Sequence, residues 1–123
     1  MPKVTEIKWL DQPEVHNYPA ALSYLSLIIS VLDADRIVEK LKHAPVDQFK
    51  AKDIFRASGL SLLGVSNSHV EKDRTKIIEG TPLSPLLLVR DTPLSKIIIA
   101  DGYHRLCAIY SFNEDAWVKC KII

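Results

Sequence analysis

The sequence predicts a single α+β domain in which a small mixed sheet is flanked by helices. Short runs of β-branched and leucine residues alternate with segments whose apolar residues recur at helical spacing. The chain has 123 residues, of which 47% are hydrophobic and 25% charged, as expected for one globular domain with one core. Its formal net charge of +1 gives no global preference for nucleic acid or for a membrane surface.

The sequence also indicates the environment of the protein. The longest apolar stretch, residues 24–32, is interrupted by serines and falls well short of the ~18 residues of a membrane span. We therefore expect no membrane partner. The first residues lack the apolar segment of a signal peptide. Cys107 and Cys120 show neither a disulfide framework nor metal-site spacing, which suits a cytoplasmic location.

Residues 1–45 predict a strand and two helices that precede a core of residues 46–123. Residues 4–10 alternate imperfectly between apolar and charged side chains, as in an edge strand. Residues 20–32 predict a helix whose polar positions are serines three and four apart. A helix this apolar is either buried or faces a second subunit, so a homodimer is one expectation. Asp33 is the expected cap of a second amphipathic helix, which ends before an Ala-Pro dipeptide.

The middle of the chain is harder to interpret. Residues 48–54 predict a short strand, and residues 54–57 the start of a turn or short helix that ends at the following glycine. Ser68 is the expected N-cap of a helix over residues 69–79, because a glutamate three positions later completes a capping-box pattern. The glycine after that helix is its expected end.

The last third of the chain predicts three strands and one helix. The strands cover residues 86–89, residues 96–100 and residues 116–123. A helix begins after Gly102 and lies between the second and third of these strands. The whole chain is therefore expected to form one domain.

The most informative stretch is IIIADGYHRLCA, residues 97–108. An apolar β-branched run ends at Asp101 and Gly102, a dipeptide typical of turns, and the residues after it have helical spacing. His104 and Arg105 therefore fall in the first turn of a helix, where free backbone N–H groups and the helix dipole favour anions. Cationic side chains at this position fit a bound anion such as a phosphate.

This stretch resembles the signature of the ParB/sulfiredoxin-like superfamily. In that signature an acidic residue and a glycine precede His-Arg or Arg-Arg, and a small residue follows three positions on; here residues 101–108 read DGYHRLCA. The helix, glycine, Leu-x-Pro and strand of residues 69–89 extend the similarity to about residues 46–123. The resemblance implies a small mixed sheet and a turn that grips a nucleotide phosphate. It makes CTP, ATP or ADP, with Mg²⁺, the expected ligand.

The predicted phosphate-binding residues comprise the turn and two upstream lysines: Gly102, Tyr103, His104, Arg105, Lys50 and Lys52. Arginine suits this task because its planar guanidinium bonds a phosphate bidentately. The two lysines point the same way if their segment is extended. Asp101 is the predicted catalytic residue, since phosphoryl transfer and nucleic-acid cleavage, known among other members of the superfamily, need a carboxylate as base or metal ligand.

Two departures limit what the resemblance implies. Sulfiredoxins would place a catalytic cysteine where this chain has Tyr103, and a tyrosine is not a sulfur nucleophile. We therefore expect no sulfiredoxin activity. Partition proteins carry a helix-turn-helix domain after the motif, whereas this sequence ends at Ile123, so we do not expect centromere clamping. A nucleotide hydrolase, a kinase and a nuclease remain open.

Alternative interpretations stay open as well. Asp101 could simply form the turn, and Arg105 could pair with Asp101 or Glu114. The lysines could be solvated surface charge. The same turn with Lys50, Lys52 and Arg56 could instead bind or cleave nucleic acid, or the chain could be a non-catalytic domain that dimerises through residues 20–32. The histidines at positions 16, 43 and 69 are far apart in sequence, so no metal site is expected.

Overall fold

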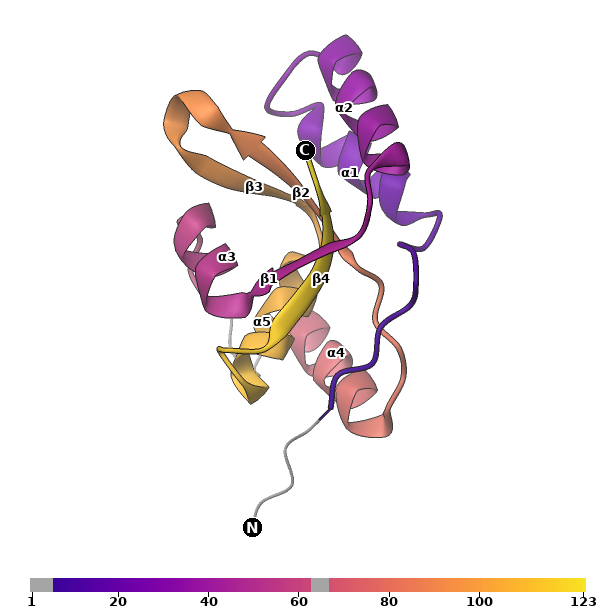
Figure 1. The fold of residues 1–123 in the computed structure, drawn as a ribbon, viewed down its shortest axis with the longest axis vertical. Coiled ribbons are helices and arrows are strands. Elements are labelled where there is room, and N and C mark those ends of the chain that lie inside the picture. Colours follow the sequence, from indigo (N-terminus) through magenta and orange to yellow (C-terminus); the bar gives the residue numbers. More distant parts are fainter. Residues whose placement is uncertain (1–5, 63–66) are drawn as a thin grey trace.

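The computed structural model describes residues 6–62 and 67–123. It confirms a mixed α+β fold, built on a four-stranded sheet with the order β1-β4-β2-β3 (Figure 1). The strands are β1 (Asp47–Lys50), β2 (Leu86–Asp91), β3 (Lys96–Asp101) and β4 (Trp117–Ile122). In these residues no helix is both long and apolar enough to cross a bilayer.

The sheet combines one parallel and two antiparallel pairings. β1 runs antiparallel to β4 and β2 antiparallel to β3, whereas the central strands β2 and β4 are parallel, with Leu86 opposite Cys120. Strand β2 begins with the run Leu86-Leu87-Leu88-Val89, and all four residues are buried. A continuous apolar run of this kind is typical of a strand that is covered on both faces.

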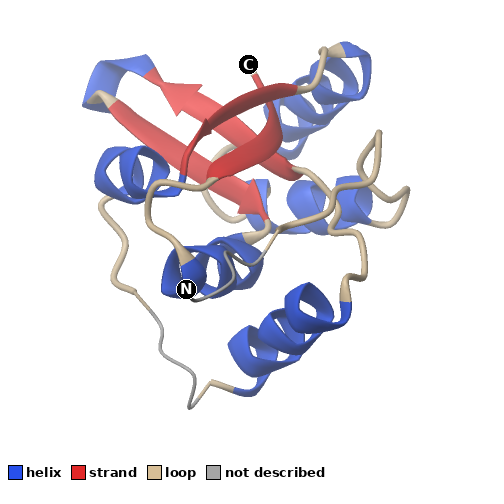
Figure 2. Cartoon of the chain, turned by 60° about the horizontal axis from the view of Figure 1, so that its bottom comes forward, coloured by secondary structure: helices blue, strands red, loops and turns tan. Residues whose placement is uncertain are grey.

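Helices cover both faces of the sheet, as Figure 2 shows. Because side chains alternate along a strand, β2 contributes to two cores. Leu87 and Val89 pack with α1 (Asn17–Leu25) and α2 (Val31–His43). Leu86 and Leu88 pack on the other face, in a core shared by α3 (Ala51–Ser58), α4 (Ser68–Glu79) and α5 (Tyr103–Phe112). A short 3₁₀ turn, η1 (Thr92–Leu94), joins β2 to β3.

The N-terminal segment differs from the prediction of a strand. Within residues 6–10 it makes one isolated parallel bridge, between Trp9 and Leu83, while residues 4 and 5 lie outside the described residues. Backbone bonds from Leu10 N to Leu83 O and from Leu83 N to Lys8 O, 2.9 and 2.8 Å long, hold it against the chain that leads into β2. The segment is thus hydrogen-bonded to the chain that leads into β2, and its Ile7 and Trp9 side chains pack against the core on one face of the sheet.

The single helix predicted over residues 20–32 is wrong, because the segment contains the end of α1 and the start of α2. α1 ends at Leu25, where the Ser26 hydroxyl donates to Leu22 O at 2.7 Å. The Ser30 hydroxyl then accepts a bond from Asp33 N at 3.2 Å and caps α2. Ser30, rather than Asp33, is therefore the N-cap. Two of the serines that were interpreted as a polar stripe therefore mark helix ends: Ser26 follows α1, and Ser30 occupies the N-cap position that serine favours.

The boundaries near β1 and α4 also differ from prediction. β1 ends at Lys50, and α3 begins at the next residue, so the strand predicted over residues 48–54 is too long. Asn67, rather than Ser68, caps α4: its Oδ1 accepts from the backbone N–H groups of His69 and Val70 at 3.0 and 3.2 Å. β2 continues two residues beyond the predicted end, to Asp91. The remaining helices and strands follow the prediction to within about two residues.

Candidate functional site

The predicted strand–turn–helix is present: β3 ends at Asp101 and α5 begins at Tyr103, with Gly102 as the N-cap between them. Gly102 has φ of +107°, a conformation that other residues rarely adopt. Space is restricted too, since a Cβ on Gly102 would lie 2.6 Å from Leu86 Cγ and 2.8 Å from Arg105 Nη2. Both conformation and packing therefore require glycine at this position.

The first turn of α5 keeps its backbone donors available. No side chain in the described part of the protein caps this helix, and its first turn contains no acidic residue. A helix start without a capping oxygen presents N–H groups and the positive end of the helix dipole. An anion bound at this end would accept hydrogen bonds from these N–H groups and would interact favourably with the helix dipole.

Arg105 is held by Asp101 across the turn. Its Nη2 donates to Asp101 Oδ2 at 2.8 Å, and the two side chains are only 15% and 19% exposed. The ion pair is one of the alternatives left open by the sequence, and it assigns Asp101 a task in shaping the turn. The buried Arg105 Nε has no hydrogen-bond partner among the residues that the structure describes.

A polar hollow of about 240 Å³ lies between α4 and the start of α5. Asp101 and the four predicted turn residues line one side of it. The other side comprises a stripe of α4 and two short loop segments: His69, Lys72, Asp73, Lys76, Glu14, His16, Pro82, Leu83 and Ser84. We call this hollow the α4–α5 pocket.

The α4 stripe was missed by the sequence interpretation. His69, Lys72, Asp73 and Lys76 are spaced three, four and seven positions from the first, which places them on one face of a helix. The buried positions Val70 and Ile77 lie on the neighbouring face, about a quarter turn around the helix from this stripe. This amphipathic pattern was a usable signal, but which neighbour the polar face meets depends on tertiary packing.

Histidine and tyrosine rings gather at the mouth of the pocket. The rings of His69 and His104 have centroids 4.9 Å apart, and those of Tyr103 and His104 are 5.6 Å apart. The Tyr103 hydroxyl donates to the Ser61 carbonyl, and burial, followed by the nearby Cys107 thiol, raises the pKa of Tyr103. His16 also lines the pocket, so three histidines that are distant in sequence meet in one site.

Asp73 is the most enclosed carboxylate on the α4 side. Its side chain is 14% exposed and its Oδ1 lies 3.9 Å from Lys76 Nζ. Burial raises the pKa of Asp73, against the opposing effect of Lys76, Arg105 and His104. Despite the acids and histidines here, the described residues contain no group of three such side chains placed to hold a metal ion.

Hydrogen bonds from the N-terminal loop fix the third wall of the pocket. The Ser84 hydroxyl donates to Asn17 Oδ1 at 2.6 Å and accepts from Glu14 N at 2.9 Å. Asn17 and Ser84 are both buried. His16 lies between Glu14 and Asn17, with its Nδ1 3.7 Å from Glu14 Oε2. This network therefore positions His16 at the pocket edge.

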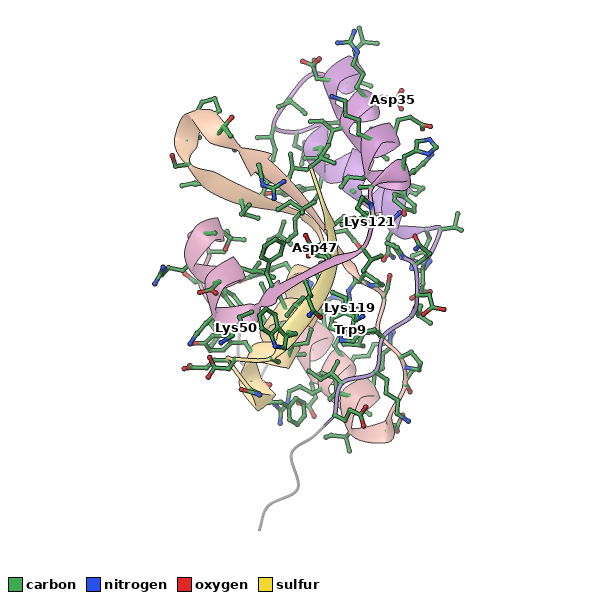
Figure 3. The ribbon with its side chains drawn as sticks, viewed as in Figure 1. Trp9, Asp35, Asp47, Lys50, Lys119 and Lys121 are labelled. Atoms are coloured by element: carbon green, nitrogen blue, oxygen red, sulfur yellow. The ribbon has the colours of Figure 1, made fainter. Side chains whose placement is uncertain are left out.

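Lys50 and Lys52 do not meet the turn. Lys50 ends β1 (Figure 3), where its Nζ lies 5.5 Å from the centre of the Trp117 ring. Lys52 is already in α3, and its Nζ lies 2.5 Å from Asp115 Oδ1, so the segment is not extended as expected. In the structurally described part of the chain, neither lysine lines the α4–α5 pocket, nor does Arg56.

Comparisons with models of known protein families, with curated proteins and with solved structures found no match for this chain.

Proposed function

We propose that the chain binds a phosphorylated small molecule, most simply a nucleotide such as CTP, ATP or ADP, in the α4–α5 pocket. The observation that carries this proposal is the α5 N-terminus, which has no side-chain cap in the described residues and opens into a polar pocket. The lining of this pocket combines Lys72, Lys76 and Arg105 with the carboxylates of Glu14, Asp73 and Asp101. Backbone N–H groups at a helix start bind phosphate oxygens directly, and the helix dipole favours the negative charge.

The side chains of the pocket supply suitable cations. Lys72 and Lys76 reach it from α4, while His69 and His104 lie together at its mouth. Asp101 neutralises Arg105, so the lysines and the backbone donors would carry most of the attraction for the phosphate. In this arrangement Arg105 shapes the turn and contributes its remaining N–H groups.

The sequence resemblance supports the same ligand. In the ParB/sulfiredoxin-like superfamily the corresponding turn grips a nucleotide phosphate, and Gly102, His104 and Arg105 occupy the matching positions here. Phosphoryl transfer or hydrolysis would need a proton acceptor near this turn. Asp101 and Asp73 are the carboxylates that line the pocket closest to it. We therefore propose a binding function, and nucleotide hydrolysis is tested alongside the binding measurement.

Isothermal titration calorimetry with CTP, ATP, ADP, GTP and inorganic phosphate, with and without Mg²⁺, tests the proposal. A single-stranded oligonucleotide belongs in the same panel, to test the nucleic-acid alternative. We expect saturable binding of at least one nucleotide. The double variant Lys72→Ala/Lys76→Ala should weaken it by roughly 10–100-fold for each lysine that bonds the phosphate, since each bond from a charged group is worth about 1.5–3 kcal/mol. Release of phosphate measured in parallel reports turnover.

The matched control is Lys50→Ala/Lys52→Ala, which removes two lysines that lie outside the pocket. Its affinity should equal that of the unmodified chain. If this control loses binding and the α4 double variant keeps it, the site lies elsewhere. Absence of any nucleotide or phosphate binding by the folded chain would contradict the proposal directly.

A further inference from the structure

Large apolar side chains are exposed where α1 turns into α2. The exposed fractions are 44% for Tyr24, 86% for Leu27, 50% for Ile28, 64% for Val31 and 73% for Leu32. From residue 17 to residue 32 the sequence contains no charged residue. We call these five residues the corner patch. Contiguous apolar surface of this kind marks a contact with another molecule.

An open apolar hollow of about 560 Å³ lies at the other end of α2. Ala44, Pro45, Ile122 and Ile123 line its floor. Its α2 side is formed by residues three, four and seven positions apart: Arg36, Glu39, Lys40 and His43. We call this the α2 hollow.

Leu32, the last residue of the corner patch, lies on the face of α2 that lines the α2 hollow. Leu32 precedes Arg36 by four positions, so it lies one turn earlier on the same stripe that lines the hollow. Figure 1 shows α2 on the outside of the molecule. The same helix face therefore presents the apolar Leu32 side chain at its start, about 16 Å before the His43 end of the α2 hollow at 1.5 Å per residue.

The charges along α2 match a second copy in antiparallel orientation. Asp33 and Asp35 lie in the first half of the helix, and Lys40 and Lys42 in the second half. Figure 3 shows Asp35 on the outer side of α2. Two such helices packed antiparallel would place the acidic half of each against the basic half of the other. Near the centre, Arg36 of one copy would face Glu39 of the second.

We propose that the chain forms a two-fold symmetric homodimer through the outer face of α2, with Leu32 of each copy seated in the α2 hollow of the other. A two-fold contact uses the same patch on both copies, so the surface must complement itself. The α2 face complements itself in shape, because Leu32 would enter the α2 hollow of the other copy. It also complements itself in charge, because the acidic half of each helix would face the basic half of the other. The existing exposed pairs Arg36–Asp33 and Lys42–Glu39, 3.5 and 3.6 Å long, are weak surface contacts that can exchange for pairs between copies.

Sedimentation equilibrium across micromolar to millimolar concentrations tests the dimer. We expect a reversible transition to twice the mass of one chain. Leu32→Asp should weaken dimerisation by at least about 100-fold, since a carboxylate would lose its water against the apolar floor of the hollow, where Leu32 gains by burial. Leu94→Asp is the matched control, because Leu94 has a similar exposed fraction, 67%, on the β2–β3 turn away from α2. It should dimerise as the unmodified chain does.

Charge reversal tests the orientation independently. Arg36→Glu places two glutamates face to face, and Glu39→Arg places two arginines face to face, so each variant alone should dimerise at least about tenfold more weakly. An equimolar mixture of the two variants restores opposite charges at both contacts and should dimerise as strongly as the unmodified chain. Circular dichroism spectra of all variants check that α2 remains helical.

The outcomes separate clearly. A chain that stays monomeric up to millimolar concentration overturns the proposal, and so does a dimer that Leu32→Asp leaves intact. A dimer that is disrupted by Leu32→Asp but not rescued in the charge-reversed mixture overturns the antiparallel arrangement. Weaker dimerisation of each single variant together with recovery in the mixture supports it. A parallel pairing would set Arg36 against Arg36 and Glu39 against Glu39 in the unmodified chain, so reversing one of these charges would remove no attraction between the copies.

Discussion

Arg105 and Asp101 form an ion pair across the glycine turn, with Nη2 and Oδ2 2.8 Å apart. The same Nη2 lies only 2.8 Å from the position that a Cβ atom on Gly102 would occupy. The end of β3, the turn and the first turn of α5 are therefore one interlocked unit. Its rigidity keeps the backbone donors of α5 directed into the α4–α5 pocket.

Replacing Gly102 by alanine should destabilise the protein by roughly 2–5 kcal/mol. Positive φ costs a non-glycine residue about 1–2 kcal/mol, and overpacking adds about 1–3 kcal/mol. The overpacking arises because the new Cβ would lie 2.6 Å from Leu86 Cγ in the core. Urea denaturation followed by circular dichroism measures the change.

Gly59→Ala separates these two causes. Gly59 also has positive φ, +68°, but the nearest atoms to its Cβ position are 3.9 Å away on the Lys96 side chain. It should therefore lose only about 1–2 kcal/mol. Equal losses in the two variants would show that Leu86 moves aside freely and that packing around the turn is loose.

Arg105→Ala should lower both stability and nucleotide affinity. It leaves the enclosed Asp101 carboxylate without its partner, which costs about 1.5–3 kcal/mol for a charged hydrogen bond. Asp101→Asn should cost less, because an amide oxygen still accepts from the guanidinium. A double-mutant cycle by denaturation gives the coupling between the two side chains.

Binding measured on the same variants distinguishes the two tasks of Arg105. If Asp101→Asn preserves the turn, it frees Arg105 from a competing carboxylate, and affinity for phosphate should rise while stability falls. A folded Arg105→Ala variant with unchanged affinity would place the ligand outside the α4–α5 pocket.

Local rules predicted the motif well. The β-branched run, Asp-Gly and the apolar spacing after it located β3, the turn and α5, because each depends on neighbouring residues alone. The end of α4 at Gly80, with φ of +76°, followed from the same kind of rule. The division between α1 and α2 was missed because serine suits both a polar stripe and a helix end.

Local sequence rules could not predict which residues line the α4–α5 pocket. His16, His69 and His104 come from segments that meet only in the folded chain. Lys50 and Lys52 were assigned to the site on the assumption of an extended segment. α3 begins between them, and Lys50 lies instead beside Trp117 and Lys52 beside Asp115. Which helix face meets the turn is decided by packing on the sheet, and periodicity alone does not encode it.

Lys121 is a buried cation that links the sheet to α2, and we predict that it is important for stability. It is 2% exposed, its Nζ donates to the Lys42 carbonyl at 2.9 Å, and the nitrogen lies 5.8 Å from the centre of the Tyr18 ring. Figure 3 shows Lys121 beside α1 and α2, which carry Tyr18 and Lys42. Lys121→Ala should cost about 2–5 kcal/mol, since it removes a packed side chain and leaves a carbonyl unsatisfied.

Two further variants separate packing from hydrogen bonding in that prediction. Lys121→Met keeps most of the side-chain volume and loses only the ammonium, so it should cost about 1–3 kcal/mol. Lys119→Ala, on the same strand but exposed, should stay within about 0.5 kcal/mol of the unmodified chain. If Lys121→Met proved as stable as the unmodified chain, the bond to Lys42 would contribute nothing.

Asp73 should make both stability and ligand binding depend on pH. Burial raises its pKa in the folded state above the usual value of 3.8, so the folded protein takes up a proton at a higher pH than the unfolded chain does. The ionised carboxylate therefore costs stability at neutral pH, and this cost disappears as the pH falls through the raised pKa. Asp73→Asn should melt at a higher temperature than the unmodified chain at neutral pH, with the difference vanishing toward pH 3.8.

The affinity for anions should also depend on whether Asp73 is ionised. Asp73 is a negative charge in the α4–α5 pocket, so Asp73→Asn should bind phosphate more tightly at neutral pH, and the advantage should shrink in acid as the native carboxyl is neutralised. Glu71→Gln is the control: it removes an exposed carboxylate from the same helix, outside the pocket, and should leave phosphate affinity at neutral pH unchanged. Calorimetric titrations of phosphate at several pH values measure both effects. Weaker binding by Asp73→Asn at neutral pH would show instead that this carboxylate organises Lys76, 3.9 Å away, for the ligand.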